Sequence, residues 1–91
     1  MVNMTNGILK FWAEWCQPCK VLAPRAEAVA EKLGVNLVSL DIDSKDGSTE
    51  AAKYGIRSIP AMVAFKDGKP IDIMVGAKST QELEEFFSKT I

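Results

Sequence analysis

The feature that most constrains this chain is the segment Trp15-Cys16-Gln17-Pro18-Cys19, which holds both of its cysteines. The segment stands where a short apolar run ends and a pattern of apolar residues at helical spacing begins. With two residues between them, the two sulfurs can close a small disulfide ring or open to two thiols without large backbone movement. The sequence therefore predicts a redox-active dithiol at a strand-to-helix corner.

This corner predicts different roles for the two cysteines. A helix that begins at Cys16 directs unpaired backbone N–H groups and the positive end of its dipole at the first sulfur, which favours the thiolate. Pro18 suits the first helical turn, because the N–H that it lacks would have no partner there. Since the thiolate is the attacking species, we expect an exposed Cys16 to be the nucleophile. Cys19, one helical turn deeper, is then the resolving thiol.

Two other uses of the cysteine pair fit the sequence less well. A structural zinc ion takes four Cys or His ligands, and this chain has two cysteines and no histidine, so no metal site is expected. Two buried structural cysteines would leave Trp15, Pro18 and the corner position without an explanation. The motif and its position after a strand therefore favour redox chemistry.

The overall composition is that of one globular domain over the 91 residues, with 47% hydrophobic and 25% charged residues. A net charge of −1 gives no electrostatic footprint for nucleic acid or for an anionic membrane. The first residues lack a basic stretch followed by a long apolar run, and no later window approaches the span of a bilayer. With both cysteines in one motif, no disulfide framework of the secreted kind remains, so a cytoplasmic location is expected.

Four stretches are predicted to be strands. Residues 8–13 form an apolar and aromatic run typical of a buried central strand, and residues 35–42 form a second buried strand. Residues 61–65 are a third strand, which leads into a hairpin turn with Asp-Gly at its centre. Residues 71–75 alternate as a half-exposed fourth strand should, and Pro70 can open that strand only at a sheet edge.

Three stretches are predicted to be helices. The first follows the dithiol and ends at a left-handed C-cap at Gly34, and Pro24 inside it is expected to kink the helix rather than end it. A short second helix is expected to be capped by Ser48 or Asp46 and to end at residue 53 or 54. The third helix begins with a capping box at residues 79–82. Its predicted apolar face comprises Leu83, Phe86, Phe87 and Ile91.

The element order βαβαββα predicts an α/β fold. The first two strands are joined through a helix as a right-handed parallel crossover, and the last two form an antiparallel hairpin. Together they make a four-stranded mixed sheet with helices on both faces. In such a sheet a reactive group lies at the carboxyl end of a strand, and the dithiol follows the carboxyl end of the first strand.

Several segments resemble the thioredoxin family, in the family's order. They are residues 11–20, Pro24, and residues 53–60, 65–68 and 75–77. The resemblance covers nearly the whole chain and implies a near-minimal thioredoxin fold that works as a monomeric protein-disulfide reductase without a cofactor. By that resemblance, Cys16 attacks a disulfide in a protein substrate, of which ribonucleotide reductase is one family example. Cys19 then releases the reduced substrate, and a thioredoxin reductase or a similar donor restores the dithiol.

The resemblance also implies residues that shape the site. Pro60 matches the family's cis-proline, although the residues alone favour a trans bond, since about one X-Pro bond in twenty is cis in folded proteins. A shallow apolar groove for substrate beside Cys16 is implied, where the residues alone indicate only ordinary surface. The groove residues are Trp15, Ile59, Pro60, Gly76 and Ala77. Trp12 is expected to serve both the core and the site.

The sequence departs from the family pattern at several places. The family has an extra strand and helix before the active-site strand, and Gln17 stands where a Gly is usual between the cysteines. Lys10 and Ser39 stand where the family has a buried Asp and a Lys. A desolvated Lys10 could act as a base, or its charge could favour a nearby thiolate. Alternatively, Lys10 extends its ammonium to water along an apolar stem and has no role.

Other functions remain as alternatives. A glutaredoxin-like reductase would use glutathione, but Trp15 and Gln17-Pro18 favour the thioredoxin type, since glutaredoxins usually have Pro-Tyr between the cysteines. An oxidase or isomerase fits a reducing compartment less well. A redox-independent accessory subunit would bind a larger enzyme through the same face.

Overall fold

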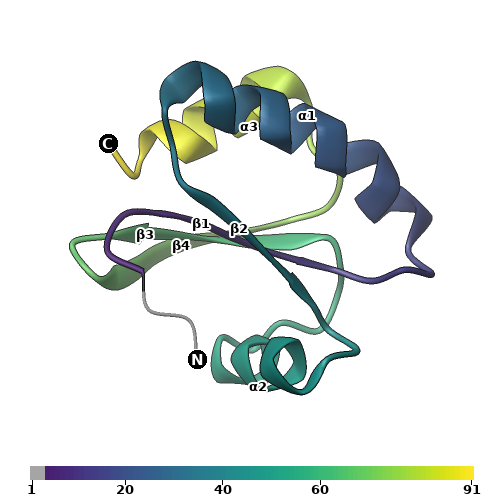
Figure 1. The fold of residues 1–91 in the computed structure, drawn as a ribbon. Coiled ribbons are helices and arrows are strands. Elements are labelled where there is room, and N and C mark those ends of the chain that lie inside the picture. The colour runs from purple at the N-terminus through teal and green to yellow at the C-terminus, as the bar shows by residue number, and fades with distance from the viewer. Residues whose placement is uncertain (1–3) are drawn as a thin grey trace.

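The structure is a computed structural model that describes residues 4–91 of the chain. Its elements follow the predicted order βαβαββα (Figure 1). They are β1 (Gly7–Trp12), α1 (Gln17–Leu33), β2 (Leu37–Asp41), α2 (Lys45–Lys53), β3 (Ala61–Lys66), β4 (Lys69–Val75) and α3 (Thr80–Ser88).

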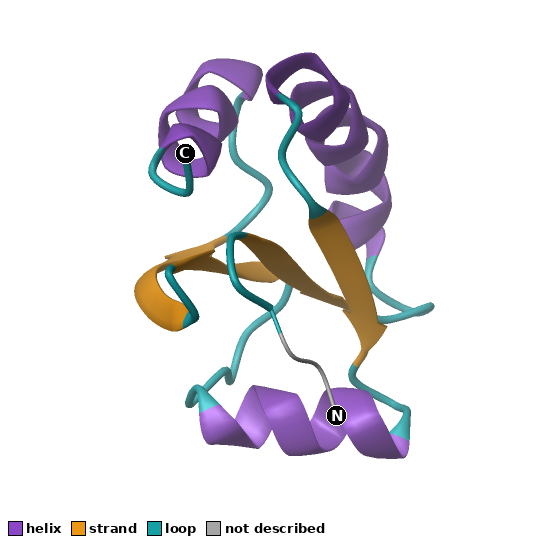
Figure 2. Ribbon diagram, turned by 60° about the vertical axis from the view of Figure 1, so that its left-hand side comes forward, coloured by secondary structure: helices purple, strands orange, loops and turns teal. Residues whose placement is uncertain are grey.

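The sheet has the order β2-β1-β3-β4, with β1 parallel to β2 and antiparallel to β3. Helices α1 and α3 cover one face and α2 lies on the other, as Figures 1 and 2 show. This confirms the predicted mixed sheet with helices on both faces. Strand β4 lies at the edge of the sheet, where Pro70 costs no ladder hydrogen bond. The register between β3 and β4 shifts between Ala64 and Phe65, and Phe65 is the partner of Pro70.

Strand β1 is buried on both faces, which explains its almost continuous apolar sequence. Because side chains alternate along a strand, Ile8 packs with the core beneath α1 and α3, whereas Leu9 and Phe11 pack with the core that includes Ala51 of α2. The same alternation places Lys10 on the α1 face. The sequence therefore carries one cation into the layer between β1 and α1.

Helix α1 begins and ends where the sequence predicts. Cys16 is its N-cap and Gly34, with φ of 68°, is its left-handed C-cap. Pro24 lies inside the helix, so it does not end it. Strand β2 is shorter than the predicted 35–42. At its start, the N–H of Val35 donates to the carbonyl of Ala30 in the helix end, at 2.9 Å, and so belongs to the helix cap.

Helix α2 starts earlier than predicted, and neither Ser48 nor Asp46 caps it. Ser44 is the N-cap, and its hydroxyl accepts a hydrogen bond of 2.9 Å from the N–H of Gly47. A Cβ on Gly47 would lie 1.8 Å from the carbonyl oxygen of Asp41. The glycine therefore lets the first turn of α2 approach the end of β2, and this tertiary contact sets where the helix begins.

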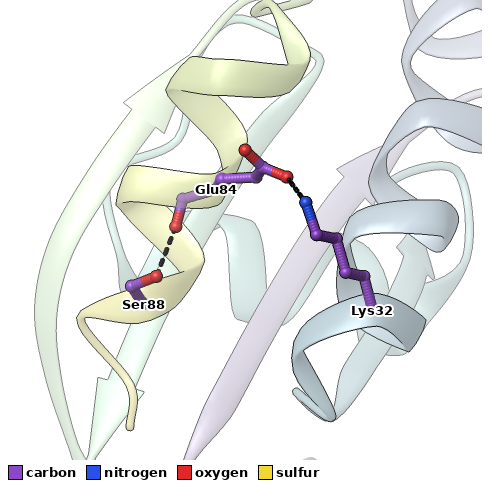
Figure 3. Close-up of polar contacts among 3 residues, drawn as sticks. All are labelled: Lys32, Glu84 and Ser88. Atoms are coloured by element: carbon purple, nitrogen blue, oxygen red, sulfur yellow. Dashed lines mark hydrogen bonds and ion pairs between the residues drawn. The ribbon is translucent and has the colours of Figure 1, made fainter.

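Helix α3 has the predicted capping box between Ser79 and Glu82, and its predicted apolar face is correct at three of four positions. Ile91 is the exception, since it follows the end of the helix and is 68% exposed. The two helices on this face are linked by an ion pair of 2.6 Å between Lys32 and Glu84 (Figure 3). Ser88 donates to the carbonyl of Glu84, also at 2.6 Å.

Strand β4 alternates as predicted, but its apolar side is the exposed one. Ile71, Ile73 and Val75 are 47%, 45% and 47% exposed, whereas Met74 packs against the core beneath α1 and α3. Helix α2 packs against β2, at the opposite edge of the sheet, and leaves this side of β4 open.

Candidate active site

The dithiol segment lies where β1 ends and α1 begins, and the two cysteines are joined in a disulfide. Cys16 has extended backbone angles, with φ of −93° and ψ of 101°, as an N-cap residue requires. Its sulfur accepts a hydrogen bond of 3.3 Å from the N–H of Cys19. The same N–H, together with the helix dipole, is placed to favour a thiolate at Cys16 after reduction.

The expectation of an exposed Cys16 is wrong for the disulfide form. Cys16 and Cys19 are each 4% exposed, because Trp12, Ile42 and Ile59 pack against the pair. Exposure therefore does not distinguish the two cysteines, whereas the helix-cap position of Cys16 does.

The first turn of α1 carries no acidic residue that would oppose a thiolate. Gln17 and Pro18 are exposed there, and Pro18 occupies a position where a missing N–H removes no helical hydrogen bond. The turn is thus the helix start that the sequence predicts, with the N–H of Cys19 donating to Cys16 Sγ.

The Ile59-Pro60 peptide bond is cis, as the family resemblance implies and against the trans bond that the residues alone favour. Pro60 is buried, and its carbonyl accepts a hydrogen bond of 2.8 Å from the N–H of Gly76. This bond holds the end of β4 beside the start of β3. Gly76, with φ of 106°, therefore lies beside Pro60, and the exposed Ala77 comes next in the chain.

A groove of about 590 Å³ lies beside the dithiol, and it brings together Trp15 and Ile59 of the predicted set. Trp15 is 65% exposed, and its indole N–H donates a hydrogen bond of 3.0 Å to Asp43 Oδ2. Pro60, Gly76 and Ala77 do not line this groove. They are connected to it through Ile59, the neighbour of Pro60 in the chain.

Sequence reasoning missed two residues of this groove region. Asp43 follows the carboxyl end of β2, which runs parallel to β1, so the loops after both strands meet at one edge of the sheet. Arg57 lines the groove and lies within the segment 53–60 that carries the family resemblance. The sequence could have indicated Asp43 through its position after the second strand and Arg57 through its position in the family segment.

A second cavity, of about 350 Å³, lies next to Cys19 and is lined by Lys10, Glu27 and Ser39 among others. Lys10 is 3% exposed. Desolvation by burial lowers the pKa of its ammonium below the ordinary value, and the Glu27 carboxylate partly opposes this change. Trp12 also lines the cavity and packs against the disulfide, in agreement with its predicted double role.

Within residues 4–91, no cluster of three or more His, Cys, Asp or Glu side chains is arranged to hold a metal ion. None of the helices in this part of the chain is long and apolar enough to cross a bilayer.

Comparisons with known proteins agree with this geometry. The family model described as Thioredoxin matches residues 2–89. A thioredoxin of Porphyra purpurea is 39% identical over 84 residues, which covers 92% of this chain and 78% of the relative. A thioredoxin of Bacillus subtilis is 39% identical over 79 residues, covering 87% of this chain and 76% of the relative.

Solved structures show the same fold. The X-ray structure of Fasciola hepatica thioredoxin superposes with a TM-score of 0.83 at 33% identity, covering 96% of this chain and 82% of that one. Reduced Schistosoma mansoni thioredoxin superposes with a TM-score of 0.84 at 32% identity, covering 98% and 82%. Thioredoxins act on disulfide-containing substrates and receive electrons from a reductase. The chain therefore belongs to the thioredoxin family and is a thiol-disulfide oxidoreductase that reduces protein disulfides through its Cys16–Cys19 pair.

Proposed function

We propose that Cys16 is the attacking thiolate and Cys19 the resolving thiol of the reduction cycle. The observation that carries this assignment is the position of Cys16 as N-cap of α1, where its sulfur accepts the N–H of Cys19. A negative charge on that sulfur is stabilised by the hydrogen bond and the helix dipole. Cys19 lies within the helix, where its backbone N–H is the donor of that bond.

The cycle conserves electrons between the chain and its substrate. The Cys16 thiolate attacks one sulfur of the substrate disulfide, and the other substrate sulfur leaves as a thiolate that takes a proton from solvent. Cys19 loses its proton and attacks Cys16 Sγ, which breaks the mixed disulfide and releases the second substrate thiolate. The substrate gains two electrons, and the chain ends in the disulfide form that the structure shows.

The groove beside Trp15 is the proposed binding site for the protein substrate. Trp15 and Ile59 supply apolar surface next to the disulfide. Gly76 and the exposed Ala77 extend this region beside the cis-proline corner, where Pro60 itself is buried. An extended substrate segment would bind along it by shape. The net charge of −1 gives little long-range steering toward a charged partner.

The proposed electron donor is a thioredoxin reductase or a similar enzyme, and ribonucleotide reductase is one proposed substrate. We place the protein as a monomer in the cytoplasm. Both cysteines belong to the active-site pair, which is the usage expected of a chain that cycles in a reducing compartment.

Insulin-disulfide reduction tests the proposed function. With a thioredoxin reductase as donor, the protein should reduce insulin over many turnovers, whereas Cys16→Ser should be inactive. Glutathione with glutathione reductase should support much slower turnover. Faster turnover with glutathione would instead favour a glutaredoxin-like enzyme, and biological activity that survives replacement of both cysteines by Ser would favour an accessory subunit.

A further inference from the structure

The cavity next to Cys19 is separate from the groove proposed to bind the substrate. It has none of its lining residues in common with the substrate groove. Its wall includes Cys19, whose sulfur must become a nucleophile in the second step, together with the one buried lysine of the described chain.

The fold brings these groups together for simple geometric reasons. Cys19, Ala23 and Glu27 are spaced by four residues, so they form one stripe along α1. Lys10 points from β1 toward this helix, and its register partner on β2 is Ser39, which also lines the cavity. The Lys10 side chain therefore lies beneath a stripe that has Cys19 at one end and Glu27 at the other.

Lys10 is buried without a partner of opposite charge in direct contact. It is 3% exposed, and the ion pairs found in residues 4–91 do not include it. Burial of this side chain desolvates the ammonium and lowers its pKa, which disfavours an unpaired charge. Glu27 acts on it through space and favours its charged form. In the disulfide form Cys19 carries no charge, so Lys10 has no anionic sulfur beside it in the cavity.

We propose that the Lys10 ammonium is the counter-ion of the Cys19 thiolate. The inference rests on the proposed function, because it supplies a partner for the resolving sulfur. In the mixed disulfide, the Cys19 thiol loses its proton to solvent, and the thiolate forms beside the ammonium. The thiolate then attacks Cys16 Sγ, the bond from Cys16 to the substrate breaks, and the electron pair leaves on the substrate sulfur. In the opposite direction, attack of a donor thiolate on Cys16 lets Cys19 leave as the paired thiolate.

Lys10 is thus a positioning residue that acts through the charge state of Cys19. The other charged groups that face the cavity are on the loop after β1 and on α1. They are Glu14, Lys20 and Glu27, all exposed. The neighbours of Lys10 in the sheet, Ser39 and Met62, do not titrate near neutral pH. Lys20 therefore offers a matched control, because it lines the same cavity from an exposed position.

The test is a titration of the Cys19 thiolate, followed by its ultraviolet absorbance in a Cys16→Ser background. Lys10→Met should raise the pKa of the Cys19 thiol, moving the midpoint up by about one pH unit, because an opposite charge is removed from a shielded site. Lys10→Arg should keep the midpoint of the parent, and so should Lys20→Met. A Lys10→Met midpoint equal to that of the parent overturns the proposal. So does a Lys10→Arg midpoint equal to that of Lys10→Met, since this would show that the positive charge is not what matters.

A second measurement needs no substitution at position 10. Coupling between two charges is reciprocal, so a Cys19 thiolate must raise the pKa of Lys10 when the disulfide is reduced. Nuclear magnetic resonance of the Lys10 side chain in the disulfide form and in reduced Cys16→Ser, where Cys19 is the only thiol, should show this increase, and identical titrations would overturn the proposal. Neither measurement requires insulin reduction. Loss of the proposed function and loss of this coupling are therefore separate outcomes.

Discussion

The indole N–H of Trp15 donates a hydrogen bond of 3.0 Å to Asp43 Oδ2, across 28 residues of sequence. This bond joins the loop after β1 to the loop after β2, the two parallel strands whose carboxyl ends meet at the active site. It fixes an aromatic side chain that is 65% exposed at the mouth of the substrate groove.

Asp43→Ala should therefore reduce kcat/KM for insulin by about two- to fivefold, since one hydrogen bond contributes about 1 kcal/mol. The bond orients Trp15 without touching the sulfurs, so KM should rise more than kcat falls. Asp46→Ala is the control, because Asp46 is an exposed residue of the neighbouring helix α2. Equal kinetics for Asp43→Ala and the parent protein would show that the indole needs no such support.

Gly47→Ala should destabilise the fold by about 1–3 kcal/mol, as overpacking does in a close contact. The added Cβ would lie 1.8 Å from the carbonyl oxygen of Asp41, so either α2 or the end of β2 must move. Chemical denaturation measures the change in free energy of unfolding. Gly34→Ala offers a comparison in which the cost arises only from a φ of 68°, because nothing lies within 4 Å of its added Cβ. Gly47→Ala should show the larger loss, and a larger loss for Gly34→Ala would contradict the close contact between α2 and β2.

Glu50→Leu should stabilise the protein by about 1–3 kcal/mol. Glu50 is 2% exposed, and among the described residues no group makes a hydrogen bond to its Oε1. An apolar side chain of similar size removes the cost of burying that oxygen. The midpoint of urea unfolding should rise for Glu50→Leu and stay nearly constant for Glu85→Leu, which changes an exposed position of α3. A lower midpoint for Glu50→Leu would mean that the carboxylate has an unseen stabilising role.

Asp72→Asn should lower stability near neutral pH by less than about 1 kcal/mol, because the ion pair with Lys89 is exposed. The hydrogen bond from Lys89 to Asp72, at 2.6 Å, lowers the pKa of this carboxyl in the folded state, and the N–H of Ile73 adds to the effect. A lowered folded pKa contributes stability above the unfolded pKa, and this contribution is lost as the pH falls through the folded pKa.

The difference in unfolding free energy between the parent and Asp72→Asn should therefore be largest at neutral pH and vanish in acid. Denaturation series at several pH values measure it, with Glu31→Gln as an exposed carboxylate control. A difference that grew as the pH fell would contradict the sign of the shift.

Local sequence signals were sufficient for much of the fold. Gly34 ends α1 and the pair Ser79 and Glu82 starts α3, because caps depend on residues that are close in sequence. The start of α2 was not accessible in the same way. Ser44 caps it because Gly47 can approach Asp41, and that contact depends on how the helix packs on the end of β2.

The dithiol and its position were predictable, whereas its surroundings were only partly so. The helix N-terminus at Cys16 follows from the pattern around Pro18, but the burial of Cys16 depends on Ile42 and Ile59, which arrive from distant loops. The cis bond before Pro60 came from family resemblance, since the residues alone favoured trans. The position of Lys10 under Cys19 and Glu27 needed the strand register and the helix face together.

The attacking role of Cys16 can be tested through the covalent intermediate of the Cys19→Ser variant, because a missing resolving thiol should leave the substrate attached. Mixed with insulin and analysed by mass spectrometry without added reductant, reduced Cys19→Ser should form a mixed disulfide at Cys16. Cys16→Ser should form far less. If Cys19→Ser forms no adduct, or if the adduct forms at Cys19 in the Cys16→Ser variant at the same rate, then Cys16 is not the attacking thiolate.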